Sequence, residues 1–180
     1  ATKKNAQVLA FEPMCSNFDI LNKNIYLNRL ADRISAFNIA FHDRSMVSHL
    51  NMSGFYAGKS GNCCDNEGPV GNEFKPVFKQ GVLGLAMDDF VGKFNQAFPN
   101  HIKIDVDGNE PIIIAGMQKI LADERLKSIA IELDPENRPD DKNAIETVKS
   151  FGFKVLEDKE YRNTLYISWT QVRNYYLVRD

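Results

Sequence analysis

An α/β fold with a mostly parallel sheet is the fold class that this sequence predicts. Short apolar runs of strand length alternate along the chain with segments whose apolar residues recur at helical spacing. Such alternation is typical of a parallel sheet with helices on its faces. The chain has 180 residues, 43% of them hydrophobic and 26% charged, which are ordinary values for a globular domain with its own core. We therefore expect a single domain over residues 1–180.

The composition also excludes several classes of function. The net charge is −2 and no long basic run occurs, so we expect no nucleic-acid partner. No apolar run approaches the roughly 20 residues that span a bilayer, and the first residues, "ATKKNAQ", are not a signal peptide. Three cysteines, two of them adjacent, do not form a disulfide framework or a zinc-ligand pattern. We expect a cytoplasmic protein without a membrane partner or a bound structural metal.

The first elements are a strand, a helix and a second strand. The apolar run Val8–Phe11 is ended by Glu12-Pro13, as expected for a buried strand that runs into a turn. The second strand is expected at Ile34–Phe41. Between them, a helix is indicated by three apolar residues at helical spacing: Phe18, Leu21 and Ile25.

The stretch between Asp43 and Gly84 interrupts this alternation. It is dense in glycine and asparagine and shows no clear hydrophobic period. A loop of this length inside a compact domain is usually functional or mobile. We expect a hairpin-like excursion over about residues 43–84 that covers a site, with Phe55 and Tyr56 as contacts; a disordered insertion is the alternative.

Alternation returns with "VLGLAMDDFVGKF", a short strand that leads into a helical turn. A helix is expected from Pro111, with an apolar stripe of Ile113, Met117, Ile120 and Leu121. The other elements expected are strands at His101–Val106, Ser128–Leu133, Gly152–Leu156 and Thr164–Trp169, and a helix at Lys142–Phe151. The last two strands are expected to form an antiparallel pair.

Acidic residues follow three of the predicted strands. They are Glu12, the pair Asp105 and Asp107, and Glu132. Because ligands bind at the carboxyl ends of the strands in such sheets, these carboxylates are candidates for a common site. An acid at such a position can accept hydrogen bonds from ribose hydroxyls, although Glu12 is equally compatible with a solvated turn.

The segment "IKIDVDG" places Lys103, Asp105 and Asp107 on one face of a strand. A buried parallel strand normally reads as a continuous apolar run, so this charged face indicates a functional carboxylate. The alternative is that Lys103 and Asp105 pair only with each other. A calcium loop is excluded, because its sixth and twelfth positions would be Glu110 and Gly116 instead of the required glycine and glutamate.

Two segments together resemble the FkbM family of S-adenosylmethionine-dependent methyltransferases. One is "VLAFEPMCSNFDILNKNIYLN" and the other is "IKIDVDGNEPIIIAGMQKIL" followed by "IAIEL". The first motif of the family is matched by Glu12, Pro13, Asn17, Phe18, Leu21 and Asn24. The second is matched by Lys103, Asp105, Gly108, Glu110, Gly116 and Glu132. The likeness runs from about Val8 to Leu133, and "LAMDDFV" resembles the family's segment between the two motifs.

The resemblance implies a three-layer, Rossmann-like class I methyltransferase sheet. The sequence departs from the family pattern at two points. Asp107 stands where the family commonly has glutamate. The first strand and its Gly-rich loop, which approach the cofactor in class I enzymes, have no counterpart before Glu12. We therefore expect an N-terminally truncated domain. A methyltransferase-like binding or assembly domain that is catalytically incomplete is the alternative function, and a nicotinamide enzyme lacks a supporting Tyr-x-x-x-Lys pattern.

The resemblance also implies the cofactor and the roles of the site residues. S-adenosylmethionine is the expected cofactor. The expected acceptor is a hydroxyl on a sugar, polyketide or similar molecule. A homo-oligomer is compatible with the sequence. Asp105 or Asp107 is the expected base or orienting group, with Glu132 beside it; a divalent metal held by these carboxylates is the alternative. The expected cofactor-binding residues are Glu12 for the ribose, Asn17 in support of that loop, and Phe41 near the adenine, unless Phe41 is a core aromatic.

Overall fold

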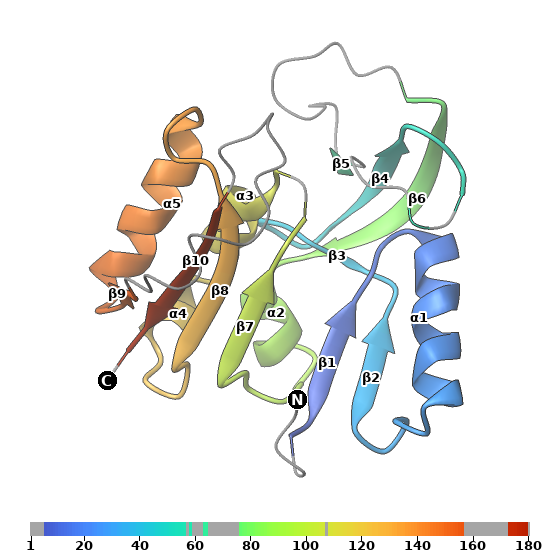
Figure 1. The fold of residues 1–180 in the computed structure, drawn as a ribbon, viewed down its shortest axis with the longest axis horizontal. Helices are drawn as coiled ribbons and strands as arrows, with labels where there is room; N and C mark the ends of the chain where they lie inside the picture. The colour runs from blue at the N-terminus through green and yellow to red at the C-terminus, as the bar shows by residue number, and fades with distance from the viewer. Residues whose placement is uncertain are drawn as a thin grey trace. The chain divides into compact units, whose positions relative to one another are not determined.

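A computed structural model gives the structure of residues 6–56, 58, 63–64, 76–106, 108–156 and 173–179. The chain divides into two compact units, Ala1–Leu85 and Ala86–Asp180. Each unit combines helix with β-sheet, as Figure 1 shows. No helix of the described residues is long and apolar enough to cross a membrane.

The first unit begins with a strand–helix–strand segment. Strands β1 (Val8–Phe11) and β2 (Ile34–Phe37) are parallel, and the helix α1 (Cys15–Leu27) connects them. A parallel pair needs a crossover connection of this kind, which the helical spacing of apolar residues in this segment predicts. The carboxyl end of β1 therefore leads directly into the Glu12-Pro13 turn and the start of α1.

The second strand differs from its predicted extent. The apolar run Ile34–Phe41 is divided into β2 and β3 (Ala40–Phe41), with Asn38 between them. The Asn38 side-chain amide donates hydrogen bonds to the backbone oxygens of Glu12 and Pro13. The strand is therefore interrupted at Asn38, whose side chain bonds to the turn after β1.

The predicted excursion forms a second sheet of the first unit. Its strands β4 (Met46–Met52), β5 (Cys63–Cys64) and β6 (Phe78–Leu85) assemble with β3 in the order β3-β6-β4-β5. β4 and β6 form a long antiparallel pair, whereas β3 and β6 are parallel. The core of this unit contains Met14, Ala40, Leu50, Met52 and Val82, with Cys64 packed against it. The excursion therefore contributes residues to the core of this unit.

The two aromatic residues predicted as contacts in the excursion are both largely exposed. Phe55 is 56% exposed and packs edge-on against Phe78, with 5.1 Å between the ring centroids. Tyr56 is 60% exposed. Their proposed role over a site stays a prediction.

The second unit contains a four-stranded sheet in the order β7-β8-β10-β9. The strands are β7 (His101–Ile104), β8 (Ser128–Leu133), β9 (Lys154–Val155) and β10 (Arg173–Val178). β7 and β8 are parallel, and β10 is antiparallel to both β8 and β9. The strand that pairs antiparallel with β9 is β10 at Arg173–Val178, which the sequence did not predict; the strand predicted at 164–169 lies outside the described residues, so its pairing stays a prediction.

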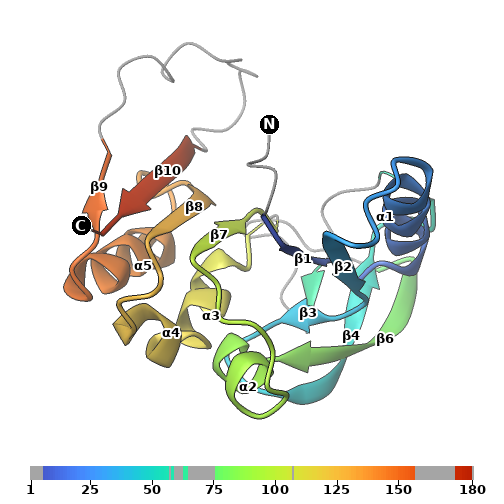
Figure 2. The same ribbon diagram turned by 90° about the horizontal axis from the view of Figure 1, so that it is seen from below.

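The described residues of the second unit form the helices α2 (Met87–Gly92), α3 (Glu110–Ala115), α4 (Gln118–Ala122) and α5 (Pro139–Ser150). The last three cover one face of its sheet. Figure 2 shows α3, α4 and α5 on the same side of β7, β8 and β10. Ile129, Ile131, Leu133 and Leu177 project to this side and are fully buried. The opposite face carries Lys103, Asp105 and Glu132, by the alternation of strand side chains.

One predicted helix is divided in two. The expected stripe of Ile113, Met117, Ile120 and Leu121 is buried throughout, but α3 ends at Ala115 and α4 begins at Gln118. The Asp88 carboxylate accepts hydrogen bonds from the backbone N–H groups of Lys119 and Ile120, at 3.0 and 3.1 Å. Asp88 therefore satisfies the free amides at the start of α4, as a capping side chain does.

The pairings confirm an α/β fold with mixed sheets. Parallel contacts join β1 to β2, β3 to β6 and β7 to β8, and the remaining pairs are antiparallel. A single, mostly parallel sheet with a Rossmann-like layout stays a prediction, and so does a single domain over the chain.

Candidate functional site

Glu12 lies in the turn between β1 and α1. Its Oε1 atom accepts a hydrogen bond from the Met14 backbone N–H at 2.8 Å, and the Asn17 side chain bonds to the same carboxylate. Partial burial raises the pKa of Glu12, while these two hydrogen bonds act in the opposite direction. The carboxylate is therefore held in one orientation but is incompletely compensated for the loss of water.

Two long-range side chains fix this turn. The Asn38 Nδ2 atom donates to the Glu12 and Pro13 carbonyl oxygens at 2.8 and 2.9 Å. Gln80, on β6, donates from Nε2 to the Pro13 oxygen at 2.7 Å and accepts the Cys15 backbone N–H at 2.9 Å. The excursion thus supports the turn that carries Glu12. Sequence analysis missed both residues, and only the polar Asn38 inside an apolar run gave a signal.

Asn17 connects the Glu12 turn with the loop after β4. Its Oδ1 atom accepts the Gly58 backbone N–H at 2.8 Å, and its side chain also bonds to Glu12. Gly58 has a φ of +81°, a left-handed conformation that favours glycine. Asn17 therefore links the turn of Glu12 to a second segment of the first unit, and its role at a cofactor site stays a prediction.

Phe41 belongs to a row of aromatic rings. The Phe11 ring lies 4.5 Å from Phe41 and 5.6 Å from Phe37, measured between ring centroids. Such ring contacts are expected if Phe41 is a core aromatic residue, which was the alternative interpretation. Stacking of Phe41 near an adenine stays a prediction.

Asp105 follows β7 in the second unit and pairs with Lys103. The Lys103 Nζ atom lies 2.7 Å from the Asp105 Oδ2 atom, and the two side chains are 65% and 45% exposed. This contact is the pairing of Lys103 with Asp105 that was the alternative interpretation of the charged strand face. The pKa of Lys103 is raised, first by the hydrogen bond and charge of Asp105 and less by the charges of Glu132 and Tyr176. Because Asp105 is nearly half exposed, its carboxylate is open to a ligand as well as to Lys103.

Glu132 lies on the neighbouring strand β8, near the same lysine. Ile104 pairs with Ile131, so Glu132 follows one residue beyond this pair, as Asp105 does on β7. The structure therefore brings Asp105 and Glu132 to corresponding ends of adjacent parallel strands, with Lys103 interacting with both. Asp107, the third predicted acid, lies outside the described residues.

The described residues contain no group of three His, Cys, Asp or Glu side chains arranged to hold a metal ion. Of the candidate acids, Glu12 accepts a backbone amide and Asp105 pairs with Lys103. A basic or orienting role for Asp105 needs only one accessible carboxylate, which the geometry provides.

The family model for the methyltransferase FkbM domain matches residues 2–155. The chain belongs to the FkbM methyltransferase family. The matched range includes both motifs, the Glu12 turn of the first unit and the acid-bearing strand ends of the second. The resemblance carried by these motifs is thereby confirmed.

A solved structure is similar to this FkbM-family chain in fold. It is the crystal structure of methyltransferase FkbM from Methylobacillus flagellatus KT, with a TM-score of 0.56 and 14% sequence identity. The similarity covers 96% of this chain and 36% of that chain, so the chain spans about a third of the length of the solved protein. No curated protein matches the FkbM-family chain.

Proposed function

We propose that this chain belongs to an S-adenosylmethionine-dependent methyltransferase that methylates a hydroxyl oxygen of a sugar, a polyketide or a similar small molecule. The observation that carries the proposal is the oriented, partly buried Glu12 carboxylate at the end of β1 in a chain of the FkbM family. The accessible Asp105 carboxylate beside Glu132 supports it from the second unit.

Glu12 is suited to bind the ribose of the cofactor. A carboxylate in this position accepts hydrogen bonds from ribose hydroxyls in nucleotide-binding α/β folds. The pKa of Glu12 is raised because its two hydrogen bonds do not compensate for burial. Two hydroxyl donors would supply the missing compensation, so the surroundings of Glu12 are suited to such a group. Asn17 holds the carboxylate in place, and Phe41 is the proposed neighbour of the adenine.

The second unit supplies the groups for the acceptor. S-adenosylmethionine, when bound, supplies an electrophilic methyl group that carries its own leaving group. A hydroxyl is a weak nucleophile near neutral pH, so a carboxylate that accepts its proton speeds the transfer. We assign this part to Asp105, with Asp107 and Glu132 as neighbouring acids. Lys103 keeps the Asp105 carboxylate on the exposed strand face through its 2.7 Å contact.

Methyl transfer from labelled S-adenosylmethionine to a panel of hydroxyl compounds tests the proposal. The assay is run with the 180-residue chain and with a form extended at its N-terminus, if the gene encodes one. Asp105→Asn removes the proton acceptor and is expected to lower the rate by about 100-fold or more, in the range of general-base catalysis. Asp140→Asn, an exposed acid on α5, is the matched control and is expected to leave the rate unchanged. Transfer that is unaffected by Asp105→Asn would remove this residue from the mechanism.

A further inference from the structure

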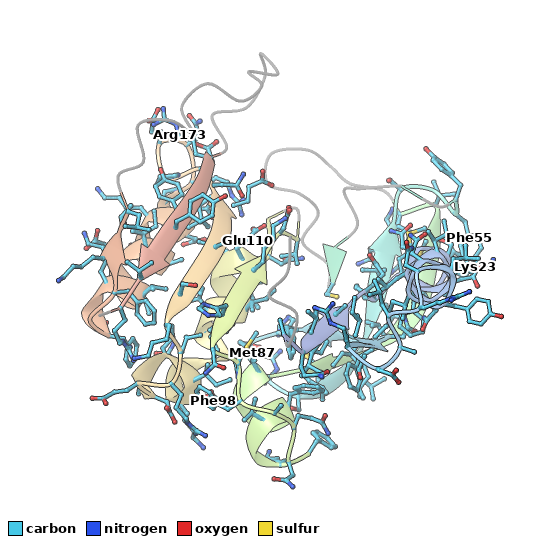
Figure 3. The ribbon with its side chains drawn as sticks, turned by 60° about the horizontal axis from the view of Figure 1, so that its bottom comes forward. Lys23, Phe55, Met87, Phe98, Glu110 and Arg173 are labelled. Atoms are coloured by element: carbon cyan, nitrogen blue, oxygen red, sulfur yellow. The ribbon has the colours of Figure 1, made fainter. Side chains whose placement is uncertain are left out.

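A cluster of charged side chains is buried in the second unit, next to the loop that carries Asp105. Glu110, labelled in Figure 3, is 1% exposed at the start of α3, and Asp141 is 0% exposed in the first turn of α5. Arg138 lies between them, and its side chain is 22% exposed. Buried charges are costly unless they are paired, so a cluster at this place calls for a specific reason.

The Arg138 guanidinium contacts the loop after β7. Its Nη2 atom donates to the Gly108 carbonyl oxygen at 2.6 Å. Its Nη1 atom lies 3.3 Å from Asp141 Oδ2 and 4.0 Å from Glu110 Oε2. One planar group thus reaches the loop that follows Asp105 and the two buried carboxylates.

Glu110 holds the same loop from the other side. Its Oε1 atom accepts the Val106 backbone N–H at 3.1 Å. Burial raises the pKa of Glu110, whereas the backbone N–H groups of Glu110, Val106 and Gly108 and the charge of Arg138 lower it. The loop amides and Arg138 therefore offset part of the cost of burying this carboxylate.

Asp141 extends the contact to the end of β8. Its Oδ2 atom accepts the Asp134 backbone N–H at 2.7 Å, directly after the strand that carries Glu132. The Arg138 backbone N–H donates to the Asp134 carbonyl oxygen at 2.8 Å. Through Gly108 on one side and Asp141 and Asp134 on the other, Arg138 connects the segments that follow β7 and β8.

We propose that Arg138 is a positioning residue that fixes the Asp105 carboxylate relative to Glu132 by holding the loop after β7 against the end of β8. The inference rests on the proposed methyl transfer, because Asp105 and Glu132 are its acceptor-side acids. The contacts of Arg138 described above are with Gly108, Glu110, Asp141 and Asp134, so the proposed effect passes through the backbone that carries the two acids. A guanidinium suits this role, since its planar fork holds donors on separate nitrogens in fixed directions, whereas the three donors of an ammonium share one nitrogen on a flexible stem.

Arg138→Lys is the decisive variant, because it keeps the charge beside the buried carboxylates and so preserves the fold. Hydrogen–deuterium exchange at the Val106 and Gly108 amides is expected to become at least 10-fold faster, while the Ile129 and Ile131 amides inside β8 stay unchanged. The kcat for methyl transfer is expected to fall at least 10-fold with an unchanged KM for S-adenosylmethionine. Arg125→Lys is the matched control, because Arg125 forms an exposed pair with Asp123 and its replacement should change neither readout.

Each result decides the inference. Unchanged exchange at Val106 and Gly108 would show that Arg138 does not hold the loop. Faster exchange with an unchanged kcat would show that the loop order has no part in positioning Asp105. If the unmodified chain transfers no methyl group in either length, the proposed function fails, and the exchange data alone still decide whether Arg138 holds the loop.

Discussion

Replacement of Gly108 by alanine tests the contact between the acid-bearing loop and Arg138. Gly108 has a φ of +113°, which L-residues other than glycine rarely adopt. A Cβ atom at this position would lie 3.3 Å from the Arg138 Nη2 atom and 3.4 Å from Nη1. The same guanidinium donates to the Gly108 carbonyl oxygen. The variant therefore strains the backbone and displaces the residue that holds it.

The expected loss of stability has two parts. A non-glycine residue at such a φ costs about 1–3 kcal/mol. A hydrogen bond from a charged group contributes about 1.5–3 kcal/mol, and a shift of Arg138 weakens it by an appreciable fraction, on the order of 1 kcal/mol. We expect Gly108→Ala to lower the free energy of unfolding by about 2–4 kcal/mol, measured by urea unfolding followed by circular dichroism.

Two controls separate these parts. Gly152 has a φ of +87° and open space where a Cβ would lie, so Gly152→Ala should cost only the backbone strain, about 1–3 kcal/mol. Gly92, without either constraint, ends the helix α2, and Gly92→Ala should leave the stability unchanged or raise it by up to about 1 kcal/mol.

A double-mutant cycle of Gly108→Ala with Arg138→Lys isolates the contact itself. The coupling free energy is expected to be about 1 kcal/mol, because the crowding and the hydrogen bond are shared by the two positions. Additive effects of the two substitutions, or equal losses for Gly108→Ala and Gly152→Ala, would refute the contact between this loop and Arg138.

Three further perturbations follow from the same structure. Because burial raises the pKa of Glu12, protonation of this carboxylate favours the folded state. This contribution to stability is present at low pH and is lost as the pH rises through the raised pKa. Glu12→Gln should therefore be more stable than the unmodified protein near neutral pH but not at about pH 4. The urea midpoints of both proteins at the two pH values measure this, and an unchanged difference would contradict it. Gln80→Ala removes both hydrogen bonds to the Glu12 turn and should cost about 1–3 kcal/mol in urea unfolding, with no loss as the contrary result. Lys103→Met removes an exposed pair with Asp105, so its free energy of unfolding should change by less than about 1 kcal/mol, and a larger loss would show that the pair is structural.

The order of elements and the location of the acids were predictable from local patterns. The predicted strand Val8–Phe11 is observed with the same bounds, because strand length and apolar character are local properties. The strand predicted at His101–Val106 is observed at His101–Ile104, so Asp105 follows it instead of lying within it. The stripe that includes Met117 and Leu121 was correctly placed in the core, although Asp88 caps a second helix within it. These features depend on residues a few positions apart.

The supports of the candidate site were not predictable in this way. Asn38 reaches back 26 residues to Glu12, Gln80 reaches 67 residues to Pro13, and Arg138 reaches 30 residues to Gly108. Single polar residues carry no period, and their partners are set by the tertiary fold. In contrast, Lys103 and Asp105 could be recognised as a pair from the sequence, because they lie only two residues apart on one strand face.

Calorimetric titration with S-adenosylhomocysteine tests the central claim most directly. The unmodified chain, in its 180-residue form or extended upstream, is expected to bind the nucleoside. Glu12→Gln should weaken the affinity roughly 10- to 100-fold, as expected for the loss of hydrogen bonds to a charged acceptor. Glu124→Gln, at an exposed position, should leave the affinity unchanged. Absence of binding in both forms, or equal affinities of the unmodified and Glu12→Gln proteins, would contradict the assignment of Glu12 to an adenosyl cofactor.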